Sequence, residues 1–150
     1  MANSDRSLLG FKGMVINLEP LCAYITLTLM DYGCFCGKNS AWPPSSNRTM
    51  DEFDARCLVH DWCYHEAEYQ ENGGWWCRPY YTSYQYYFGE NNVAYCGKQH
   101  WLWGNSNTNN RCQEFLCQCD IKFANSMRQL IENPNGARNC PKRNPGCPKG

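Results

Sequence analysis

Twelve cysteines in a chain of 150 residues limit the fold more than any other feature of this sequence. An even and high number of cysteines at this length is typical of a secreted domain held together by disulfides. Each native disulfide contributes about 2–4 kcal/mol to stability, so such a chain need not rely on its hydrophobic core alone. We therefore expect a disulfide-rich protein that is secreted and extracellular.

Zinc sites are the alternative for a cysteine-rich chain, and they favour pairs of cysteines separated by two residues. The closest cysteines here, Cys34 with Cys36 and Cys117 with Cys119, are each separated by a single residue. This spacing argues against zinc and in favour of disulfides.

The charged residues balance, with 14 basic and 14 acidic side chains. A nucleic-acid partner therefore has no electrostatic support, and we expect none. Six tryptophans and ten tyrosines suit packing against disulfides, and they also suit a membrane–water interface. The longest apolar run, residues 23–30, is too short to span a membrane. The N-terminus has no apolar signal-peptide segment, so we expect a processed or recombinant form of a secreted chain.

Three stretches have the pattern of helices. Apolar residues recur at helical spacing over residues 8–18 before Pro20, which predicts an amphipathic N-terminal helix that packs on the core and offers one face to lipid. A second helix is expected after Thr49 or Asp51, either of which can serve as N-cap, and extends to about residue 69. A third helix is expected from about residue 110 to about residue 131.

The connections between these helices are rich in glycine, proline and polar residues. We expect an irregular connection over residues 21–29 and a tight loop over residues 31–37. Residues 86–96 predict a β-hairpin with its turn at Gly89–Asn92, and residues 104–110 an Asn-rich loop. Asn47 begins an N-glycosylation sequon on an exposed turn.

A histidine, a carboxylate and a tyrosine lie close together in the second expected helix, between two cysteines. His60 precedes Tyr64 by one helical turn, so the two side chains share a face, while Asp61 projects about 100° away from His60. Cys57 and Cys63 flank the cluster. A titratable histidine between two covalent anchors indicates a site held rigid for chemistry.

The third expected helix offers a partner for this histidine. If Cys63 and Cys119 link the two long helices in antiparallel register, His60 and Asp120 can meet across the helix pair. A carboxylate bonded to one ring nitrogen leaves the other nitrogen as a base. No serine or cysteine nucleophile accompanies the pair, so the base would activate water. Asp61, facing the backbone carbonyls of a loop, would make an oxygen-rich site suited to calcium.

Four segments of the chain match the signature of a known family. They are Tyr32-Gly-Cys-Phe-Cys-Gly37, Asp54, Cys57-Leu-Val-His-Asp-Trp-Cys-Tyr64 and Cys117-Gln-Cys-Asp120. Together they resemble the secreted, calcium-dependent phospholipases A2. The resemblance implies a mainly α, disulfide-rich fold with an N-terminal amphipathic helix, two long antiparallel disulfide-linked helices, a calcium-binding loop and a small β-hairpin.

The resemblance also implies an activity, which is calcium-dependent hydrolysis of the sn-2 ester of a glycerophospholipid at a membrane or micelle surface. His60 would be the general base for the attacking water, and Asp120 would orient His60. Tyr64 and Tyr84 would hydrogen-bond to Asp120. The products would be a free fatty acid and a lysophospholipid.

Calcium is the cofactor that the resemblance implies. Its ligands would be the Asp61 carboxylate and the backbone carbonyls of Phe35, Gly37 and Asn39. The metal and the Gly37 N–H would stabilise the oxyanion. The interfacial surface and the acyl channel would include Leu8, Leu9 and Phe11.

The resemblance assigns eight of the cysteines to four disulfides: Cys36–Cys57, Cys63–Cys119, Cys77–Cys112 and Cys96–Cys117. Two further bridges that are common in the family lack both partners here, so no thiol is left over. The pairing of the remaining cysteines, Cys22, Cys34, Cys140 and Cys147, stays open. Cys34 should reach the C-terminal tail, and we favour Cys34–Cys140 and Cys22–Cys147.

The calcium loop departs from the family pattern, because it is longer than usual and Asn39 stands where a glycine is usual. Asparagine tolerates a left-handed backbone better than most residues, so the site can survive. The segment 97–111 is also longer than usual and carries Trp101 and Trp103, which either touch lipid or pack on the hairpin.

Residues Met1–Arg6 precede the expected single domain, residues 7–150. We expect this segment to be disordered, either as a leader released by cleavage after Arg6 or as the remnant of a tag. The oligomeric state stays open.

A non-catalytic, phospholipase A2-like protein that binds calcium or membranes is the alternative from a different functional class. Such relatives usually lose the calcium aspartate or the histidine, whereas His60 and Asp61 are both present here. The lengthened calcium loop is the one sequence feature that favours this alternative. The intact base and metal aspartate favour the enzyme.

Overall fold

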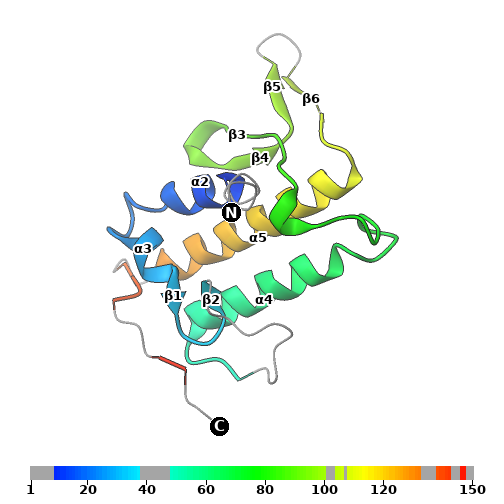
Figure 1. Ribbon diagram of the computed structural model, residues 1–150. Helices are drawn as coiled ribbons and strands as arrows, with labels where there is room; N and C mark the ends of the chain where they lie inside the picture. The colour runs from blue at the N-terminus through cyan, green and yellow to red at the C-terminus, as the bar shows by residue number, and fades with distance from the viewer. Residues whose placement is uncertain are drawn as a thin grey trace. The chain divides into compact units, whose positions relative to one another are not determined.

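The computed structural model describes residues 9–37, 48–100, 104–106, 108–132, 138–142 and 146–147. Within these residues the protein is helix-rich, with short antiparallel strand pairs and six disulfides (Figure 1). This composition confirms the expected mainly α, disulfide-rich class. No helix in the described part of the chain is both long and apolar enough to cross a membrane.

The elements follow one another in a simple order along the chain. They are α2 (Leu9–Ile16), α3 (Ile25–Leu29), β1 (Asp31–Tyr32), β2 (Cys36–Gly37), α4 (Glu52–Glu66), η1 (Pro79–Tyr81), β3 (Tyr86–Phe88), η2 (Glu90–Asn92), β4 (Ala94–Cys96), β5 (Lys98–His100), β6 (Gly104–Ser106) and α5 (Arg111–Ile131). The strands form the antiparallel pairs β1–β2, β3–β4 and β5–β6. The N-terminal helix, the two long helices and the hairpin over residues 86–96 are confirmed.

The chain divides into two compact units. The first comprises Met1–Met14 and Trp62–Lys122, and the second comprises Val15–Asp61 and Phe123–Gly150. The boundaries fall inside α2, α4 and α5, so each of these helices contributes to both units. The assignment of residues 7–150 to a single domain stays a prediction.

The core of the first unit forms around disulfides. Its central cluster combines aromatic, aliphatic and cystine side chains: Tyr64, Ala67, Cys77, Cys112, Leu116 and Cys119. The β3–β4 hairpin pairs Tyr86 with Cys96, and its turn carries Asn91 and Asn92 at positive φ. Asparagine adopts this backbone region more readily than most residues, which explains the tight turn expected there.

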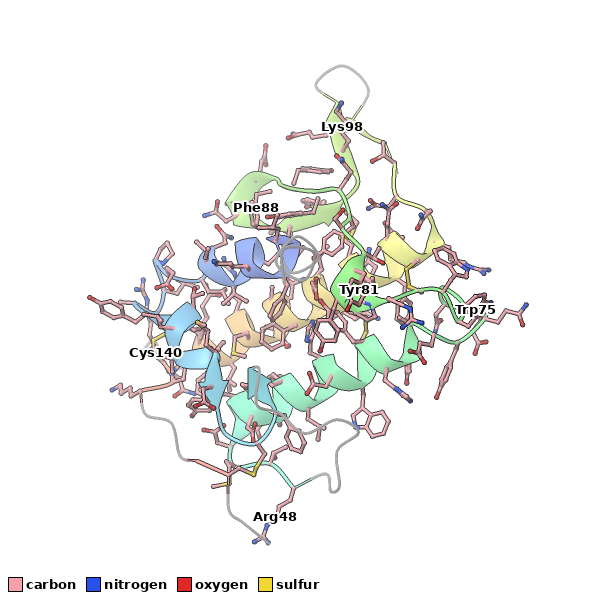
Figure 2. The ribbon with its side chains drawn as sticks, in the orientation of Figure 1. Arg48, Trp75, Tyr81, Phe88, Lys98 and Cys140 are labelled. Atoms are coloured by element: carbon pink, nitrogen blue, oxygen red, sulfur yellow. A yellow bond between two sulfur atoms is a disulfide. The ribbon has the colours of Figure 1, made fainter. Side chains whose placement is uncertain are left out.

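Aromatic side chains line one side of the β3 segment. The rings of Tyr84 and Tyr86 meet edge to face with centroids 5.9 Å apart, and those of Tyr86 and Phe88 follow at 5.7 Å. Figure 2 labels Phe88 on this hairpin. These residues alternate along an extended chain, so they share one face. Each edge-to-face contact of this kind contributes about 0.5–1.5 kcal/mol to stability beyond the contribution of the buried ring area.

The second unit places aliphatic side chains from three segments in its core. Leu18, Ile25, Met127 and Ile131 are each almost fully buried. Asp51 begins α4 as its N-cap, because its carboxylate Oδ1 accepts a hydrogen bond of 2.9 Å from the Asp54 N–H. One of the two expected caps is therefore confirmed.

The expectation of an irregular connection over residues 21–29 is wrong, because Ile25–Leu29 forms α3. The Glu19 carboxylate accepts hydrogen bonds from the N–H groups of Tyr24 (2.6 Å) and Thr26 (3.0 Å), which satisfies donors at the start of this helix. The Thr26 side chain is the main cause that lowers the Glu19 carboxyl pKa, and the backbone N–H groups of Thr26 and Tyr24 lower it further. The acceptor lies several residues before the helix, where no local pattern reveals it.

Two boundaries also differ from the expected ones. α4 ends at Glu66, before the expected end near residue 69, because the following N–H groups bond to carbonyls three residues earlier and tighten the chain. Part of the expected loop over residues 104–110 is strand, since Gly104–Ser106 pairs with Lys98–His100. Strand pairing uses backbone groups, so it needs no apolar alternation in the sequence.

All twelve cysteines are paired, and the four disulfides implied by the resemblance are confirmed. The favoured pairing of the other four is wrong. The structure joins Cys22 to Cys140 and Cys34 to Cys147, so Cys34 does reach the tail but bonds to the later cysteine. The Arg138 guanidinium Nη1 donates to the carbonyls of Pro20 (3.2 Å) and Leu21 (3.5 Å), which helps to place Cys140 beside Cys22.

Replacing Cys22 and Cys140 together by serine should lower the free energy of unfolding by about 2–4 kcal/mol, because the bridge closes a long loop of the unfolded chain. Chemical denaturation under non-reducing conditions measures this change. A non-reducing peptide map that joined Cys22 to Cys147 would contradict the pairing.

Candidate active site

A buried carboxylate fixes the loop that joins β1 to β2. Asp54 lies in the first turn of α4 and is fully buried. Its Oδ1 accepts hydrogen bonds from the N–H groups of Cys34 (3.0 Å) and Phe35 (2.8 Å), and its Oδ2 accepts one from Met50 (2.9 Å). Hydrogen bonds to an ionised acceptor are stronger than neutral ones, so this carboxylate attaches the loop firmly to the helix.

Two further links attach the same loop to α4. The Tyr32 hydroxyl donates to the Asp51 carboxylate, and burial is the main cause that raises the Tyr32 pKa. The Cys36–Cys57 disulfide joins β2 to the middle of the helix. The loop that was expected to supply carbonyl ligands is therefore held at three points.

Two glycines allow the loop to take its path. Gly33 has a φ of 61° and Gly37 a φ of 100°, a region that favours glycine. A Cβ on Gly33 would overlap the Asp54 carboxylate, and one on Gly37 would overlap the Met30 carbonyl. The Gly37 backbone can approach this closely only because it has no side chain.

Asp61 follows His60 on α4 and has one carboxylate oxygen in a buried position. Its Oδ2 is buried and has no hydrogen-bond partner among the described residues. Burial raises the pKa of the Asp61 carboxyl to about 6, while the neighbouring His60 opposes this shift and the charge of Asp54 adds to it. A buried carboxylate oxygen without a donor fits a cation as its partner.

The donor set around Asp61 indicates which cation would fit. The described residues contain no group of three or more His, Cys, Asp or Glu side chains suited to a metal. A cation bound by Asp61 and by backbone carbonyls would have oxygen ligands, which calcium accepts. Phe35 and Gly37, two of the expected carbonyl donors, lie in the loop attached to α4, whereas Asn39 lies outside the described residues.

His60 is buried on α4, between the two disulfide-bonded cysteines of that helix. Its ring packs against Phe123, with ring centroids 5.1 Å apart and an interplanar angle of 54°. The aromatic contact restricts the orientation of the imidazole. Whether Asp120 bonds to His60 stays a prediction.

Asp120 is fully buried in the first unit and is held by two tyrosines. The Tyr64 hydroxyl donates to its Oδ1 at 2.6 Å, and the Tyr84 hydroxyl donates to its Oδ2. Burial, followed by the negative charge of Asp120, raises the pKa of both phenols well above the usual value. The phenols therefore stay protonated and serve as fixed donors to the carboxylate.

Side chains from the start of α5 hold the segment that carries Tyr84. The Asn109 amide exchanges two hydrogen bonds with the backbone of Gln85, at 2.8 and 2.9 Å. The Gln113 side chain donates to the Ser83 carbonyl at 2.9 Å. The residues on both sides of Tyr84 are thus fixed, which directs its hydroxyl toward Asp120.

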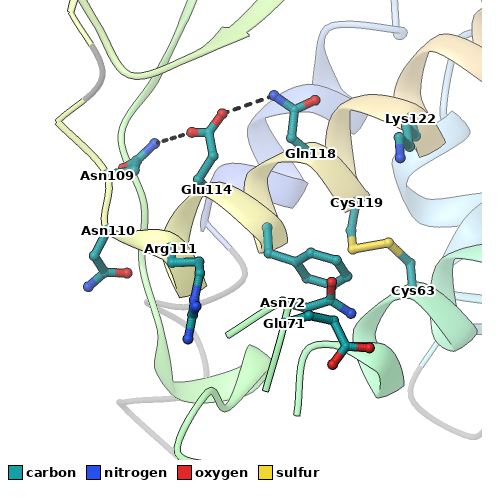
Figure 3. A pocket seen from close by; sticks show the side chains of 11 residues that line it. Cys63, Glu71, Asn72, Asn109, Asn110, Arg111, Glu114, Gln118, Cys119 and Lys122 are labelled. Atoms are coloured by element: carbon teal, nitrogen blue, oxygen red, sulfur yellow. Dashed lines mark hydrogen bonds between the residues drawn. A yellow bond between two sulfur atoms is a disulfide. The ribbon is translucent and has the colours of Figure 1, made fainter. Parts of the chain in front are cut away.

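A pocket with a volume of about 450 Å³ lies in the first unit, apart from the expected catalytic residues (Figure 3). Its lining is Cys63, Glu71, Asn72, Asn109, Asn110, Arg111, Glu114, Phe115, Gln118, Cys119 and Lys122. Asn109 and Gln118 both donate to Glu114 along its edge, at 3.4 and 3.1 Å. None of His60, Asp61 and Asp120 lines this pocket.

The structure joins Tyr64 and Tyr84 to Asp120, as expected, and places Asp61 and His60 next to each other on α4. Asp54 belongs to the family signature, but the signature alone assigns it no role. Asp51 and Asp54 stand three residues apart before an apolar run, which is a signal for a helix start. A helix-start signal does not reveal that the Asp54 carboxylate also binds the N–H groups of Cys34 and Phe35.

These features define a small disulfide-linked helical protein with two buried aspartates and a histidine on its long helices. A family model described as Phospholipase A2 matches residues 8–137. The phospholipase A2 homolog otoconin-22 of Xenopus laevis is 33% identical over 105 residues, which cover 70% of this chain and 68% of the relative. The chain therefore belongs to the phospholipase A2 family. This membership supports a phospholipase-like function.

Tyr84→Phe should lower the free energy of unfolding by about 1.5–3 kcal/mol, because it removes a hydrogen bond to a buried carboxylate. Urea denaturation at pH 7 measures the change. Tyr95→Phe is the matched control, since Tyr95 is partly exposed and stacks on Tyr87. Equal effects of the two substitutions would show that the Tyr84 hydroxyl contributes nothing specific.

Asp61→Asn should make the metal-free protein more stable at pH 7, by on the order of 2 kcal/mol, and leave it nearly unchanged near pH 4. The folded carboxyl keeps its proton up to about pH 6, whereas the unfolded one loses it near 3.8. The folded state therefore binds more protons between these values, and the free energy of unfolding falls as the pH rises.

Denaturation midpoints in EDTA at several pH values test this expectation. Asp31→Asn, which neutralises an exposed carboxylate, is the control for a loss of charge. A constant difference between Asp61→Asn and the unaltered protein from pH 4 to pH 7 would contradict the raised pKa.

Proposed function

We propose that this protein is a calcium-dependent phospholipase A2 that hydrolyses the sn-2 ester of glycerophospholipids at a lipid interface. The observation that carries the proposal is the buried oxygen of Asp61, which has no donor among the described residues and lies beside His60 on α4. A histidine base next to a buried carboxylate oxygen that lacks a hydrogen-bond donor suits metal-assisted hydrolysis. Membership of the phospholipase A2 family adds independent support.

In this proposal His60 is the general base. Its neutral imidazole accepts a proton from a water molecule as the water attacks the ester carbonyl, and it then returns the proton to the leaving alkoxide of the lysophospholipid. Asp120 fixes the imidazole tautomer and stabilises the imidazolium. The hydroxyls of Tyr64 and Tyr84 hold the Asp120 carboxylate in place, because both donate to it.

The calcium ligands in this proposal are the Asp61 carboxylate and the carbonyls of Phe35, Gly37 and Asn39. Bound calcium supplies positive charge that stabilises the oxyanion formed at the ester carbonyl. The Gly37 N–H donates to the same oxyanion. The three links between the loop and α4 support this arrangement, because they hold the carbonyl donors on the element that bears Asp61.

A phospholipid membrane or micelle surface is the partner that fits this activity. Leu9 of α2 is 59% exposed, which supports its expected place at the interface, whereas Phe11 is half-buried and Leu8 lies outside the described residues. Leu27 and Met30 are also exposed, at 67% and 50%. Exposed aliphatic side chains of this kind favour contact with acyl chains. The six disulfides support a secreted, extracellular location.

A second candidate function is calcium or membrane binding without catalysis. The observation that favours it is the relative named phospholipase A2 homolog otoconin-22, whose name carries no enzyme assignment. In this chain His60, Asp61 and Asp120 are all retained, which favours the enzyme.

A lipid assay separates the two candidates. Purified protein should release the sn-2 fatty acid from phosphatidylcholine micelles in millimolar calcium and should stop when EDTA is added. His60→Gln should lower kcat/KM by about 10²–10⁴-fold, because it removes the base. It should leave calcium binding, measured by isothermal titration calorimetry, unchanged.

Hydrolysis that survives chelation would overturn the calcium mechanism. Calcium binding by the unaltered protein without any release of fatty acid would favour the non-catalytic alternative. His65→Gln is the matched control, since His65 lies on the same helix and stacks edge to face between Trp62 and Tyr69.

A further inference from the structure

We propose that Asp54 is a positioning residue for calcium: it holds the loop between β1 and β2 in its metal-binding conformation before the metal arrives. The calcium affinity of the protein therefore depends on a carboxylate that does not touch the metal. This inference rests on the proposed function, because it concerns the same loop and the same ion.

The contacts of Asp54 are unusual for a carboxylate near a proposed cation site. It is fully buried, and the hydrogen bonds that its carboxylate accepts from described residues come from backbone donors: Cys34, Phe35 and Met50. The Cys34 N–H lies within 3.0 Å of Oδ1 and 3.1 Å of Oδ2, so it bridges both oxygens. The charge is therefore used to orient the main chain.

Orienting these N–H groups also orients neighbouring carbonyls. The N–H and C=O of a trans peptide point in opposite directions, so the carbonyls of Gly33 and Cys34 point away from Asp54. The carboxylate thus sets the direction of two consecutive peptide planes immediately before the Phe35 carbonyl. Gly33, with φ of 61°, brings the backbone close enough for this contact.

The other links to α4 cannot set these directions. The Cys36–Cys57 disulfide and the Tyr32–Asp51 hydrogen bond attach side chains, and the peptide planes between Tyr32 and Cys36 can still rotate about φ and ψ. Asp54 contacts the peptide groups themselves. Of the three links between this loop and α4, it is the one that acts directly on peptide groups.

The Phe35 carbonyl, a proposed calcium ligand, belongs to the next peptide, so Asp54 affects calcium affinity by fixing the N–H side of Phe35. Carbonyl oxygens that converge on one point repel each other until a cation is bound, so a loop without support turns them apart. Reorienting these carbonyls toward the cation costs free energy and so weakens calcium binding. A loop that already holds them in the binding orientation avoids this cost. A tenfold change in Kd corresponds to about 1.4 kcal/mol, which is less than one charge-assisted hydrogen bond can contribute.

The test compares Asp54→Asn with Glu52→Gln. Asp54→Asn keeps the size of the side chain and one acceptor oxygen but loses the second oxygen and the charge. Glu52→Gln removes a negative charge from the same turn of α4, and the Glu52 side chain is 71% exposed and pairs only with Arg56 among the described ion pairs. Intact disulfides and a cooperative unfolding transition identify folded variants.

Three readouts are needed: the calcium Kd from titration calorimetry with calcium chloride, kcat at saturating calcium, and amide hydrogen exchange of Cys34 and Phe35 in EDTA. Asp54→Asn should raise the calcium Kd by about tenfold or more, keep kcat at saturating calcium within about threefold, and speed exchange at both amides. Glu52→Gln should leave all three near the values of the unaltered protein.

The possible failures are distinguishable. If the unaltered protein binds calcium and Asp54→Asn binds it equally well, Asp54 has only a structural role and the inference is overturned. A fall in kcat with an unchanged Kd overturns it as well. If the unaltered protein binds no calcium, the proposed function fails and this inference fails with it.

Discussion

Two disulfides determine how α4 is held, and the proposed base and calcium ligand, His60 and Asp61, lie on that helix. Cys57 attaches it to the loop between β1 and β2, and Cys63 attaches it to α5. His60 and Asp61 lie between these two attachment points. A helix anchored on both sides of a short segment can neither slide nor rotate there, so the side chains of that segment keep one orientation.

Three aspartates of the long helices have three different environments. Asp54 is compensated by backbone N–H groups, and Asp120 by the hydroxyls of two tyrosines. Asp61 keeps one buried oxygen without a donor among the described residues, and burial raises its pKa. Of these three carboxylates, only Asp61 has a buried oxygen that lacks a donor among the described residues and that a cation could stabilise. The protein thus separates aspartates that organise structure from the one that is available to a ligand.

The sequence allowed prediction of those features that depend on local spacing or on a family signature. The placement of His60 and Asp61 on one helix followed from the helical period, and the bonds of Tyr64 to Asp120 followed from the resemblance. The role of Asp54 did not follow, because its partners are backbone groups that every residue carries and no letter of the sequence marks them. The tail disulfides were mispaired for a related reason, since their choice depends on where Arg138 and its neighbours bind.

The position of Cys34 and Cys36 has a thermodynamic consequence. Both ends of this three-residue segment are cross-linked, one to Cys147 and the other to Cys57. Ordering a free backbone costs about 1–2 kcal/mol of conformational entropy per residue. Here that loss occurs during oxidative folding and not when a ligand arrives. In an oxidising compartment the segment therefore loses its conformational entropy during folding. In a reducing compartment the same loss would occur when a ligand binds and would weaken that binding.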